Sequence, residues 1–146
     1  MKTDMHAEEL LELSCNLDDM TGEGIGFAMD RLLEAGALDV WTEAIGMKKS
    51  RPGVLLRVLC RETERETMVR LLFLHTTTLG VRENVCRRYA LDRDLEQAET
   101  PYGPVRVKRS AGYGVTRSKA EYEDLARISR ETGKSLTALR KELNLD

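Results

Sequence analysis

The chain of 146 residues is short of several residue types, and each shortage excludes a class of protein. Only 5% of its residues are aromatic, and its 23 Lys and Arg residues do not outnumber its 25 Asp and Glu residues. Proteins that bind nucleic acid generically carry a strong basic excess, so we expect no nucleic-acid partner. No apolar run approaches the roughly 20 residues that a membrane-spanning helix needs, and we therefore expect no association with a membrane.

Residues that ligate soft metals are also scarce. The two histidines share no helical spacing, and Cys15, Cys60 and Cys86 are far apart, with no CxxC pair. This pattern predicts reduced thiols in a cytoplasmic protein and no preformed zinc site. The first nine residues are acidic and lack an apolar stretch, so we expect no secretory signal. We expect residues 1–8 to form a disordered or tag-like tail.

What the sequence does contain is clear periodicity. Apolar residues recur at every second position in four segments and at helical spacing in two others. In chain order the expected elements are a strand at 10–17, a helix from Ile25 to about Gly36, strands at 38–45 and 53–60, a helix from a Thr63–Glu66 capping box to His75, and a strand from Val81 to Leu91. The order βαββαβ predicts an α+β fold, a ferredoxin-like sandwich with its core at about 9–93.

The remaining residues, about 94–146, are expected to extend this core within a single domain that spans 9–146. The expected elements are a turn at Thr100–Gly103, a short strand or hairpin around Val105–Val107, a helix from a Ser118–Glu121 capping box to Gly133, and a last helix from Ser135. Gly112 and Gly114 interrupt a basic stretch between the strand and the first of these helices. That composition is typical of a mobile loop that closes over an anion, or of a loop that merely faces solvent.

The predicted topology gathers polar residues at one edge of the sheet. The end of the first strand, the start of the first helix, the turn between the second and third strands, and the link into the fourth strand share that edge. The candidate residues there are Asp18, Asp19, Lys48, Lys49, Arg51, Thr76, Thr77, Thr78 and Arg82. Cations, hydroxyls and a helix N-terminus favour an anion, which two adjacent carboxylates would repel. A Mg²⁺ or Mn²⁺ ion between carboxylate and phosphate oxygens resolves this conflict, so the sequence predicts a metal–nucleotide or metal–phosphate site.

Each part of this edge also has a purely structural interpretation. Asp18 and Asp19 could cap the first helix, and Lys48–Arg51 could be a solvated turn. The Thr76–Thr78 run could simply connect a helix to a strand. A packed or C-capping role is favoured for His75, and buried inert thiols are favoured for the cysteines. The convergence of the polar elements on one edge is what favours a site.

Six blocks of the sequence resemble those of a known family. They are Asn16–Glu23, Met29–Trp41, Met47–Gly53, Thr76–Arg82, Pro101–Lys108 and Glu121–Asp124. In this order, from about Glu9 to about Arg140, they resemble the C-terminal domain of the nickel-insertion proteins of the lactate racemase cofactor pathway, the LarC family. Six ordered blocks are far more specific than a single short motif.

The resemblance implies a function that the composition does not. The family inserts nickel into pyridinium-3,5-bisthiocarboxylic acid mononucleotide to make the nickel-pincer cofactor, and it cleaves CTP to CMP and pyrophosphate with Mn²⁺ or Mg²⁺. The C-terminal domain is its CTP-binding part. By this resemblance Asp18 and Asp19 would hold the metal. The triphosphate would be held by Lys48, Lys49, Arg51, Thr76, Thr77, Thr78, Arg82 and Lys108.

The chain also departs from the family pattern. Nothing in it corresponds to the larger, His-rich N-terminal domain, so nickel would be bound mainly by that domain, acting in cis or in trans. Ala120 stands where the family usually has proline, a mild exchange in a first helical turn. An alternative is a non-catalytic, ferredoxin-like module for nucleotide sensing or oligomerisation. RNA binding would need aromatic residues on the central strands, and these have none.

One face of the predicted sheet also indicates a partner. Leu10, Leu55 and Leu59 share the face away from the helices with Glu12 and Arg57. Apolar patches on such faces mark interaction surfaces. We predict a homo-oligomer joined through this face, so light scattering should give a multiple of the 16.5-kDa chain mass. A strictly monomeric mass would contradict this prediction.

Overall fold

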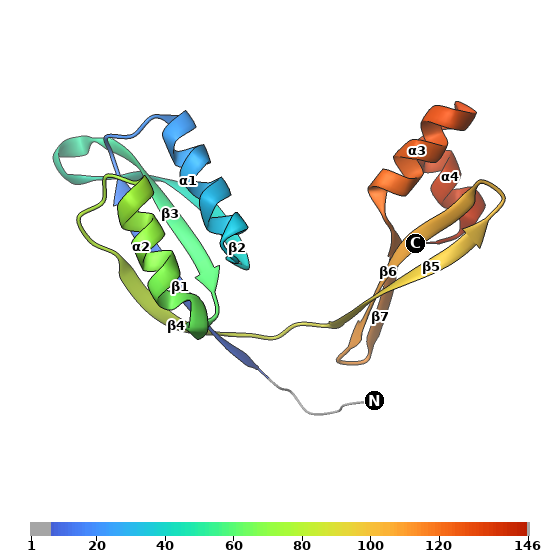
Figure 1. The fold of residues 1–146 in the computed structure, drawn as a ribbon, viewed down its shortest axis with the longest axis horizontal. Helices are drawn as coiled ribbons and strands as arrows, with labels where there is room; N and C mark the ends of the chain where they lie inside the picture. Colours follow the sequence, from blue (N-terminus) through green and yellow to red (C-terminus); the bar gives the residue numbers. More distant parts are fainter. Residues whose placement is uncertain (1–6, 146) are drawn as a thin grey trace. The chain divides into compact units, whose positions relative to one another are not determined.

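The computed structural model describes residues 7–145, in which the chain divides into two compact units. The first unit is Ala7–Arg88 and the second begins at Tyr89 (Figure 1). The boundary therefore lies a few residues before the expected end of the ferredoxin-like core at about residue 93. Most of the predicted tail, residues 1–6, is outside the described residues, while Glu8 already belongs to the first strand.

The first unit contains the predicted βαββαβ order. Its elements are β1 (Glu8–Leu17), α1 (Gly22–Glu34), β2 (Asp39–Gly46), β3 (Pro52–Cys60), α2 (Arg65–His75) and β4 (Arg82–Arg88), with short 3-10 turns at Lys48–Ser50 and Glu62–Glu64. The strands pair in the order β2-β3-β1-β4, antiparallel throughout. This is the ferredoxin-like arrangement, so the predicted fold class is confirmed.

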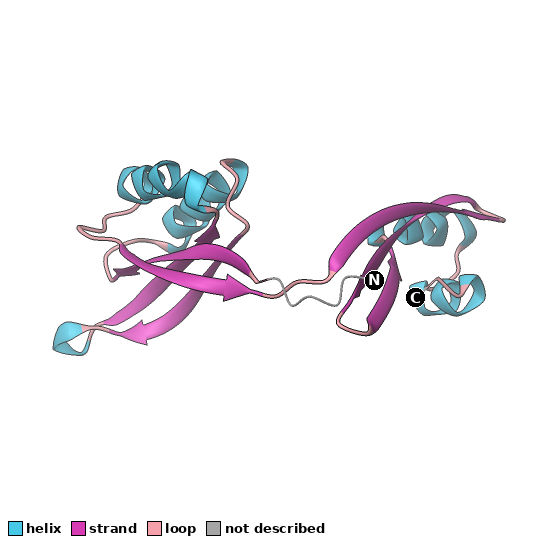
Figure 2. Ribbon diagram, turned by 90° about the horizontal axis from the view of Figure 1, so that it is seen from below, coloured by secondary structure: helices cyan, strands magenta, loops and turns pink. Residues whose placement is uncertain are grey.

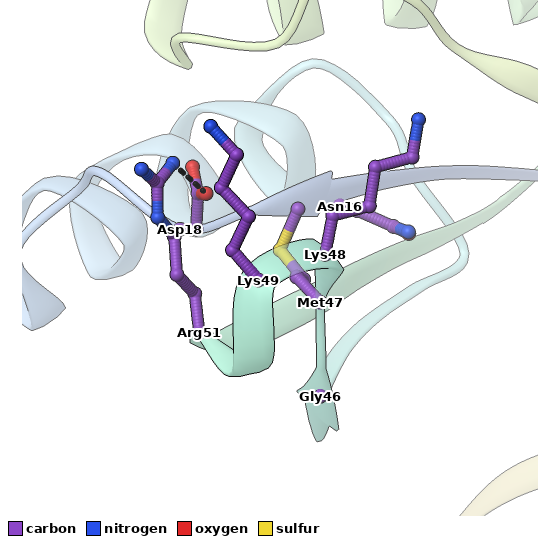
Figure 3. Close-up of a pocket in the computed structure, with 7 residues that line it drawn as sticks. All are labelled: Asn16, Asp18, Gly46, Met47, Lys48, Lys49 and Arg51. Atoms are coloured by element: carbon purple, nitrogen blue, oxygen red, sulfur yellow. Dashed lines mark ion pairs between the residues drawn. The ribbon is translucent and has the colours of Figure 1, made fainter.

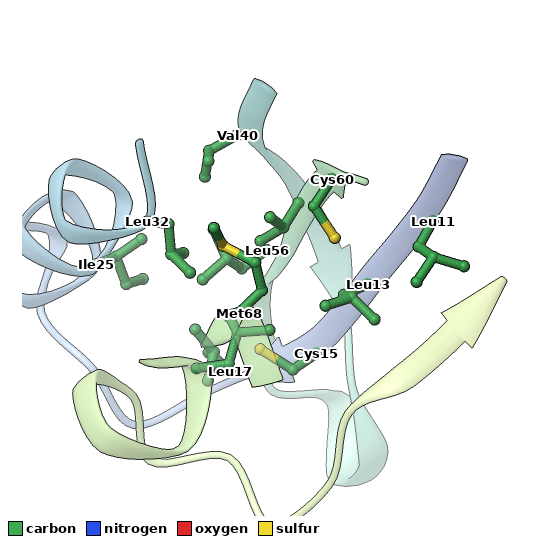
Figure 4. Packing of buried hydrophobic residues seen from close by; sticks show 12 residues of the cluster. Leu11, Leu13, Cys15, Leu17, Ile25, Leu32, Val40, Leu56, Cys60 and Met68 are labelled. Carbon is green, nitrogen blue, oxygen red and sulfur yellow. The ribbon is translucent and has the colours of Figure 1, made fainter. Parts of the chain in front are cut away.

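The core of this unit lies between the sheet and the two helices. Residues at alternate positions of β1 face the helices and are buried, as the period-two pattern predicts. Figure 4 shows their packing against side chains from β2, β3, α1 and α2. The buried set is Leu11, Leu13, Cys15, Leu17, Ile25, Leu32, Val40, Leu56, Val58, Cys60, Met68 and Leu72.

The predicted Thr63–Glu66 capping box is wrong. Residues 62–64 form a 3-10 turn, and α2 begins at Arg65 without a side-chain cap. The Arg65 guanidinium instead reaches Glu83 of β4, with 2.5 Å between Nε and Oε1. The start of this helix is thus tied to the neighbouring strand by an ion pair, which short-range sequence signals do not reveal.

The open face of the sheet is less apolar than the sequence suggested. Leu10 is 1% exposed and Leu55 is 8% exposed, so both are already buried within the chain. The centre of this face is an ion-pair network, in which Arg57 binds Glu12 and Glu43. Oligomerisation through this face stays a prediction, with little leucine surface left to drive it.

The second unit is a three-stranded antiparallel sheet with two helices. Its elements are β5 (Asp92–Thr100), β6 (Gly103–Gly112), β7 (Val115–Ala120), α3 (Tyr122–Thr132) and α4 (Leu136–Leu143). The strand order is β5-β6-β7, and Figure 2 shows strands and helices in separate colours. The helices cover one face of the sheet, where the core consists of Val105, Val107, Ala120, Leu125, Ile128 and Leu139.

This unit contains more sheet than the sequence predicted. Strand β5 was missed because its residues are nearly all exposed and more than half are charged, which hides any alternation. The predicted Ser118–Glu121 capping box is wrong, since Ser118 lies in β7 and α3 begins at Tyr122. The predicted helix end is correct, with Gly133 in the left-handed region at φ 74°.

The two glycines in the basic stretch belong to a tight hairpin. Strands β6 and β7 are joined at Tyr113 and Gly114, which have φ angles of 52° and 76°. Two central residues with positive φ are typical of a two-residue type I′ turn. The prediction of an anion-closing loop at this place is therefore wrong. The last predicted helix is correct, because the Ser135 hydroxyl accepts from the Ala138 N–H at 3.1 Å.

An acidic pair fixes the start of α3 against β6. The Asp124 carboxylate accepts from the Arg106 backbone N–H at 2.7 Å and from its guanidinium at 3.0 and 3.1 Å. Glu121 forms an ion pair with Lys108, with 3.4 Å between Oε1 and Nζ. The Glu121–Asp124 block, noted above for its family resemblance, thus has a structural role in this unit. Among residues 7–145, no helix is long and apolar enough to cross a membrane.

The Asp124 contacts predict an acid sensitivity. Hydrogen bonds from Arg106 hold the pKa of Asp124 below its usual value. The stabilisation is therefore complete above the unfolded-state pKa of about 4, and it is lost as the pH falls through the lower folded-state pKa. We expect Asp124→Asn to lower the free energy of unfolding by about 1 kcal/mol at pH 7, and by less near pH 2. Chemical denaturation of both proteins between pH 2 and pH 7 should show the difference in their free energies of unfolding shrink as the pH falls. Glu123→Gln is the control. A pH-independent difference would contradict this explanation.

Candidate functional site

A pocket of about 570 Å³ opens at the predicted edge of the first unit (Figure 3). The end of β1 and the turn between β2 and β3 form its walls. Its lining residues are Asn16, Asp18, Gly46, Met47, Lys48, Lys49 and Arg51. The pocket therefore contains four of the sequence-predicted site residues and combines one carboxylate with three cations.

The β2–β3 turn holds its cations in an unusual backbone conformation. The Met47 N–H donates to the Arg51 carbonyl at 2.7 Å, which closes the turn. Within it, Lys49 and Ser50 have φ angles of 60° and 58°, in the left-handed region. This region costs a residue with a side chain about 1 kcal/mol, and such strain clusters at ligand-binding sites. Ordinary tight turns also place consecutive residues in this region, as the β6–β7 hairpin does at Tyr113 and Gly114, so this geometry is compatible with the solvated-turn interpretation as well.

The two carboxylates face different neighbours. Asp18 lies 3.6 Å from Arg51, measured between Oδ2 and Nη1, whereas Asp19 accepts a hydrogen bond from the Thr77 hydroxyl. Neither carboxylate caps α1, because the Thr21 hydroxyl accepts from the Gly24 N–H at 3.1 Å. The capping alternative for Asp18 and Asp19 is thus wrong. Instead, these two residues connect the end of β1 to the turn on one side and to the α2–β4 link on the other.

Only one of the three threonines in that link faces the site. The Thr76 hydroxyl donates to the Leu72 carbonyl at 2.6 Å and ends α2, and the Thr78 hydroxyl donates to the Gly80 carbonyl at 2.7 Å. Thr77 is exposed and binds Asp19. The connecting role given above as an alternative therefore fits Thr76 and Thr78, and Thr77 is the member available to a ligand.

A buried thiol lies beneath the link. Burial raises the pKa of Cys15, although the hydroxyls of Thr78 and Thr76 pull it downward. A raised pKa keeps this thiol protonated, as expected of an inert core cysteine. His75 is packed, with its ring edge-on to Phe27 at 5.5 Å between centroids. Both observations confirm the structural roles predicted for these residues.

Asn16 is a site residue that the sequence analysis missed. It lines the pocket, and its side-chain oxygen accepts from Arg82 Nη2 at 2.8 Å. Arg82, a predicted site residue at the start of β4, is thereby linked to the pocket. The available signal was the position of Asn16 on the polar phase of β1, directly before Leu17 and the two carboxylates.

Lys108 stands apart from this group. It lies on β6 in the second unit, where Glu121 is its ion-pair partner. All the other predicted site residues belong to the first unit. The first unit thus contains nine of the ten sequence candidates, and four of them line the pocket.

The donor set at the end of β1 suits a hard cation. Within residues 7–145, no three His, Cys, Asp or Glu side chains form a metal-binding group. Asp18 at the pocket, with Asp19 next to it in the sequence, fits Mg²⁺ or Mn²⁺, which are held by one or two carboxylates and take their other ligands from phosphate and water. These carboxylates do not resemble a sulfur- or nitrogen-rich site for a softer metal.

The fold and this edge define a class, a ferredoxin-like unit with a charged pocket where β1 ends. Comparison with known proteins gives the family. The family model described as nickel insertion protein matches residues 1–140, and the chain belongs to this family. A putative nickel insertion protein of Roseiflexus castenholzii is 48% identical over 131 residues, which are 89% of this chain and 33% of the relative.

A second curated relative and two solved structures are also similar to this chain. The pyridinium-3,5-bisthiocarboxylic acid mononucleotide nickel insertion protein of Alkaliphilus metalliredigens is 46% identical over 121 residues, 83% of this chain and 29% of that protein. Among solved structures, the apo C-terminal domain of a cyclometallase involved in the synthesis of the NPN cofactor of lactate racemase has a TM-score of 0.84 and 35% identity, with 93% of this chain and 94% of that chain covered. A Methanopyrus kandleri protein has a TM-score of 0.72 and 27% identity, with 92% and 86% covered. The chain thus spans about a third of its curated relatives and nearly all of the cyclometallase domain.

The close packing behind the pocket gives a test of its geometry. A Cβ atom on Gly53 would lie 2.8 Å from Met47 Cγ and 3.0 Å from the Leu17 carbonyl oxygen. We expect Gly53→Ala to lower the free energy of unfolding by about 1–3 kcal/mol, because both neighbours must move. Gly46→Ala is the matched control, since a Cβ there meets no atom within 4 Å. Equal stabilities of the two variants in chemical denaturation would contradict this packing.

Proposed function

We propose that this chain is the nucleotide-binding part of a nickel insertion protein that makes the nickel-pincer cofactor, and that its pocket binds CTP together with Mn²⁺ or Mg²⁺. The observation that carries the proposal is the shared pocket of Asp18, Lys48, Lys49 and Arg51. The family resemblance suggests CTP as the nucleotide, and the pocket contains the charges that a metal-bound triphosphate requires.

The cations of the turn are available to a phosphate. The side chain of Arg51 is 59% exposed and only 3.6 Å from Asp18, a weak pair that a ligand can replace. Lys48 and Lys49 form no ion pair with any residue among 7–145. An arginine can grip a phosphate with two parallel hydrogen bonds, while lysines act as point charges beside it. These three residues are our candidates for the triphosphate, with Arg82 held near them by Asn16.

The carboxylates would hold the divalent cation. Asp18 and Asp19 each use one oxygen in the contacts described above, which leaves their second oxygens for a metal. The cation supplies neutralisation of charge on the phosphate oxygens. The chain itself positions the triphosphate with its cations and orients Asp19 through the Thr77 hydroxyl. In cleavage of CTP to CMP and pyrophosphate, water adds to the α-phosphorus as the bond to the β-phosphate oxygen breaks. This step needs positioning and charge neutralisation, with no side-chain nucleophile.

Nickel is the cargo of the proposed reaction and is expected to reach this unit from elsewhere. Burial raises the pKa of both Cys15 and Cys60, which leaves them poor thiolate ligands. The curated relatives are about three times as long as this chain. We therefore propose that the remaining part of such a protein, in cis or in trans, binds nickel and the pyridinium bisthiocarboxylate mononucleotide. A homo-oligomer is part of the same proposal.

The second candidate function is a module that binds the nucleotide without cleaving it. The observation in its favour is that the described lining of the pocket includes no hydroxyl, thiol or imidazole side chain. Release of CMP and pyrophosphate from CTP and Mn²⁺ separates the two functions, because only the insertase part turns the nucleotide over.

Removing the carboxylates tests the proposed metal site. We expect Asp18→Ala and Asp19→Ala each to weaken CTP binding at least tenfold in the presence of Mn²⁺, because the cation loses a ligand and the triphosphate charge is no longer neutralised. The residual, metal-independent binding should be unchanged or stronger, since a negative charge has been removed. Equilibrium dialysis with labelled CTP measures both quantities.

The matched control is Asp30→Ala, which removes an exposed carboxylate of α1 that does not line the pocket. It should bind CTP like the unmodified chain. Unchanged Mn²⁺-dependent binding in both Asp18→Ala and Asp19→Ala would overturn the assignment of the metal to this edge.

A further inference from the structure

The open face of the second sheet carries cations in neighbouring positions. Strand pairing places Arg93 of β5 opposite Ser110 of β6, and Ser110 opposite Arg117 of β7. We name these three residues the arginine row. In the next row, Lys108 lies opposite Leu95 on one side and Lys119 on the other. Because side chains alternate along a strand, both rows face away from the buried Val105 and Val107, and so away from α3 and α4.

Three of these four cations lack a counter-ion, whereas Lys108 is paired with Glu121. Arg93, Arg117 and Lys119 are exposed, and none forms an ion pair or side-chain hydrogen bond with any residue of 7–145. On the opposite face of the same sheet, Arg109 is paired with Glu96. Like charges in neighbouring cross-strand positions destabilise a sheet. The charges of Arg93, Arg117 and Lys119 are thus not neutralised by any described side chain of the unit.

The geometry of the arginine row suits a single phosphate group. Neighbouring strands are about 4.8 Å apart, so the backbones that carry Arg93 and Arg117 are about 10 Å apart. The short Ser110 side chain between them is half-buried and leaves room above the sheet. A phosphate over Ser110 is within reach of both guanidinium groups and of the serine hydroxyl. Arginine is the residue best suited to grip it in this way.

We propose that the arginine row binds the phosphate monoester of a nucleotide, with Lys119 adding charge beside it. Leu95, which is 60% exposed and two residues from Arg93 on the same face, provides an apolar surface for the attached ring or sugar. A single row of this kind suits a small ligand, whereas nucleic acids are bound by longer basic stripes. The inference rests on the proposed function in one respect: the pyridinium mononucleotide is then the nucleotide bound here, separately from the CTP pocket of the first unit.

The test compares small phosphate monoesters by calorimetry at low salt. The probes are nicotinate mononucleotide, which contains a pyridinium ring, CMP, and inorganic phosphate. We expect nicotinate mononucleotide to bind, with its affinity falling about tenfold in Arg93→Gln and in Arg117→Gln. Tighter binding of CMP would assign the row to the cytidine product instead, and would overturn the pyridinium assignment.

Two further variants make the result specific. Arg109→Gln removes an arginine of β6, the strand between β5 and β7, from the opposite face of the sheet, and it should bind like the unmodified chain. Ser110→Glu places a carboxylate between the two arginines, so it should abolish binding while raising the melting temperature. A folded Ser110→Glu variant that still binds the mononucleotide would overturn the proposal. Full affinity in both Arg→Gln variants, or binding of an RNA oligomer in preference to every mononucleotide, would also overturn it.

The same variants separate this inference from the proposed function. CTP titrated with Mn²⁺ should bind to Arg93→Gln and Arg117→Gln as it does to the unmodified chain. If the unmodified chain does not bind CTP but binds the mononucleotide through Arg93 and Arg117, only the proposed function is contradicted. If the unmodified chain binds CTP but does not bind the mononucleotide, only the assignment of the arginine row is contradicted.

Discussion

The structure of the first unit depends on β1, the strand through which both its core and its site are built. Its apolar positions fill the space beneath α1 and α2, and it pairs with β3 on one side and β4 on the other. Where this strand ends, its polar residues hold the neighbouring segments in place. Asn16 binds Arg82, Asp18 pairs with Arg51, and Asp19 binds Thr77. The position of β1 in the sheet therefore determines both the packing of the core and the placement of the charged residues at its end.

We propose that the charged edge is a binding site and not only a stabilising network. Its ion pair is long and exposed, and its turn places Lys49 and Ser50 in the left-handed region. Elsewhere the chain forms tight pairs, such as Arg106 with Asp124 and Lys134 with Glu142 at 2.8 Å. Tyr113 and Asn144 also have positive φ angles, so the conformation of this turn supports the proposed site only together with its charges. The chain belongs to the nickel insertion family, and its fold matches that of a cyclometallase domain.

The fold and the site could be predicted from the sequence to different degrees. The fold of the first unit could be predicted from its periodicity, because a strand such as β1 buries alternate residues and these positions are therefore apolar in the sequence. Strand β5 could not be found, since it has almost no buried residue. The helix starts at Arg65 and Tyr122 depend on contacts with distant strands, so local capping signals were misleading. Topology was enough to group Asp18, Lys48 and Arg51, but the separate partners of Asp18 and Asp19 required coordinates.

The central claim is that the pocket at the end of β1 binds a metal-bound triphosphate. The most direct measurement is a calorimetric titration of the unmodified chain with CTP, with and without Mn²⁺, with ATP as the comparison. This account predicts binding that needs the metal and prefers CTP, because carboxylates and phosphates can share the pocket only through a cation. Equal binding with and without Mn²⁺, or no binding of either nucleotide, would contradict it.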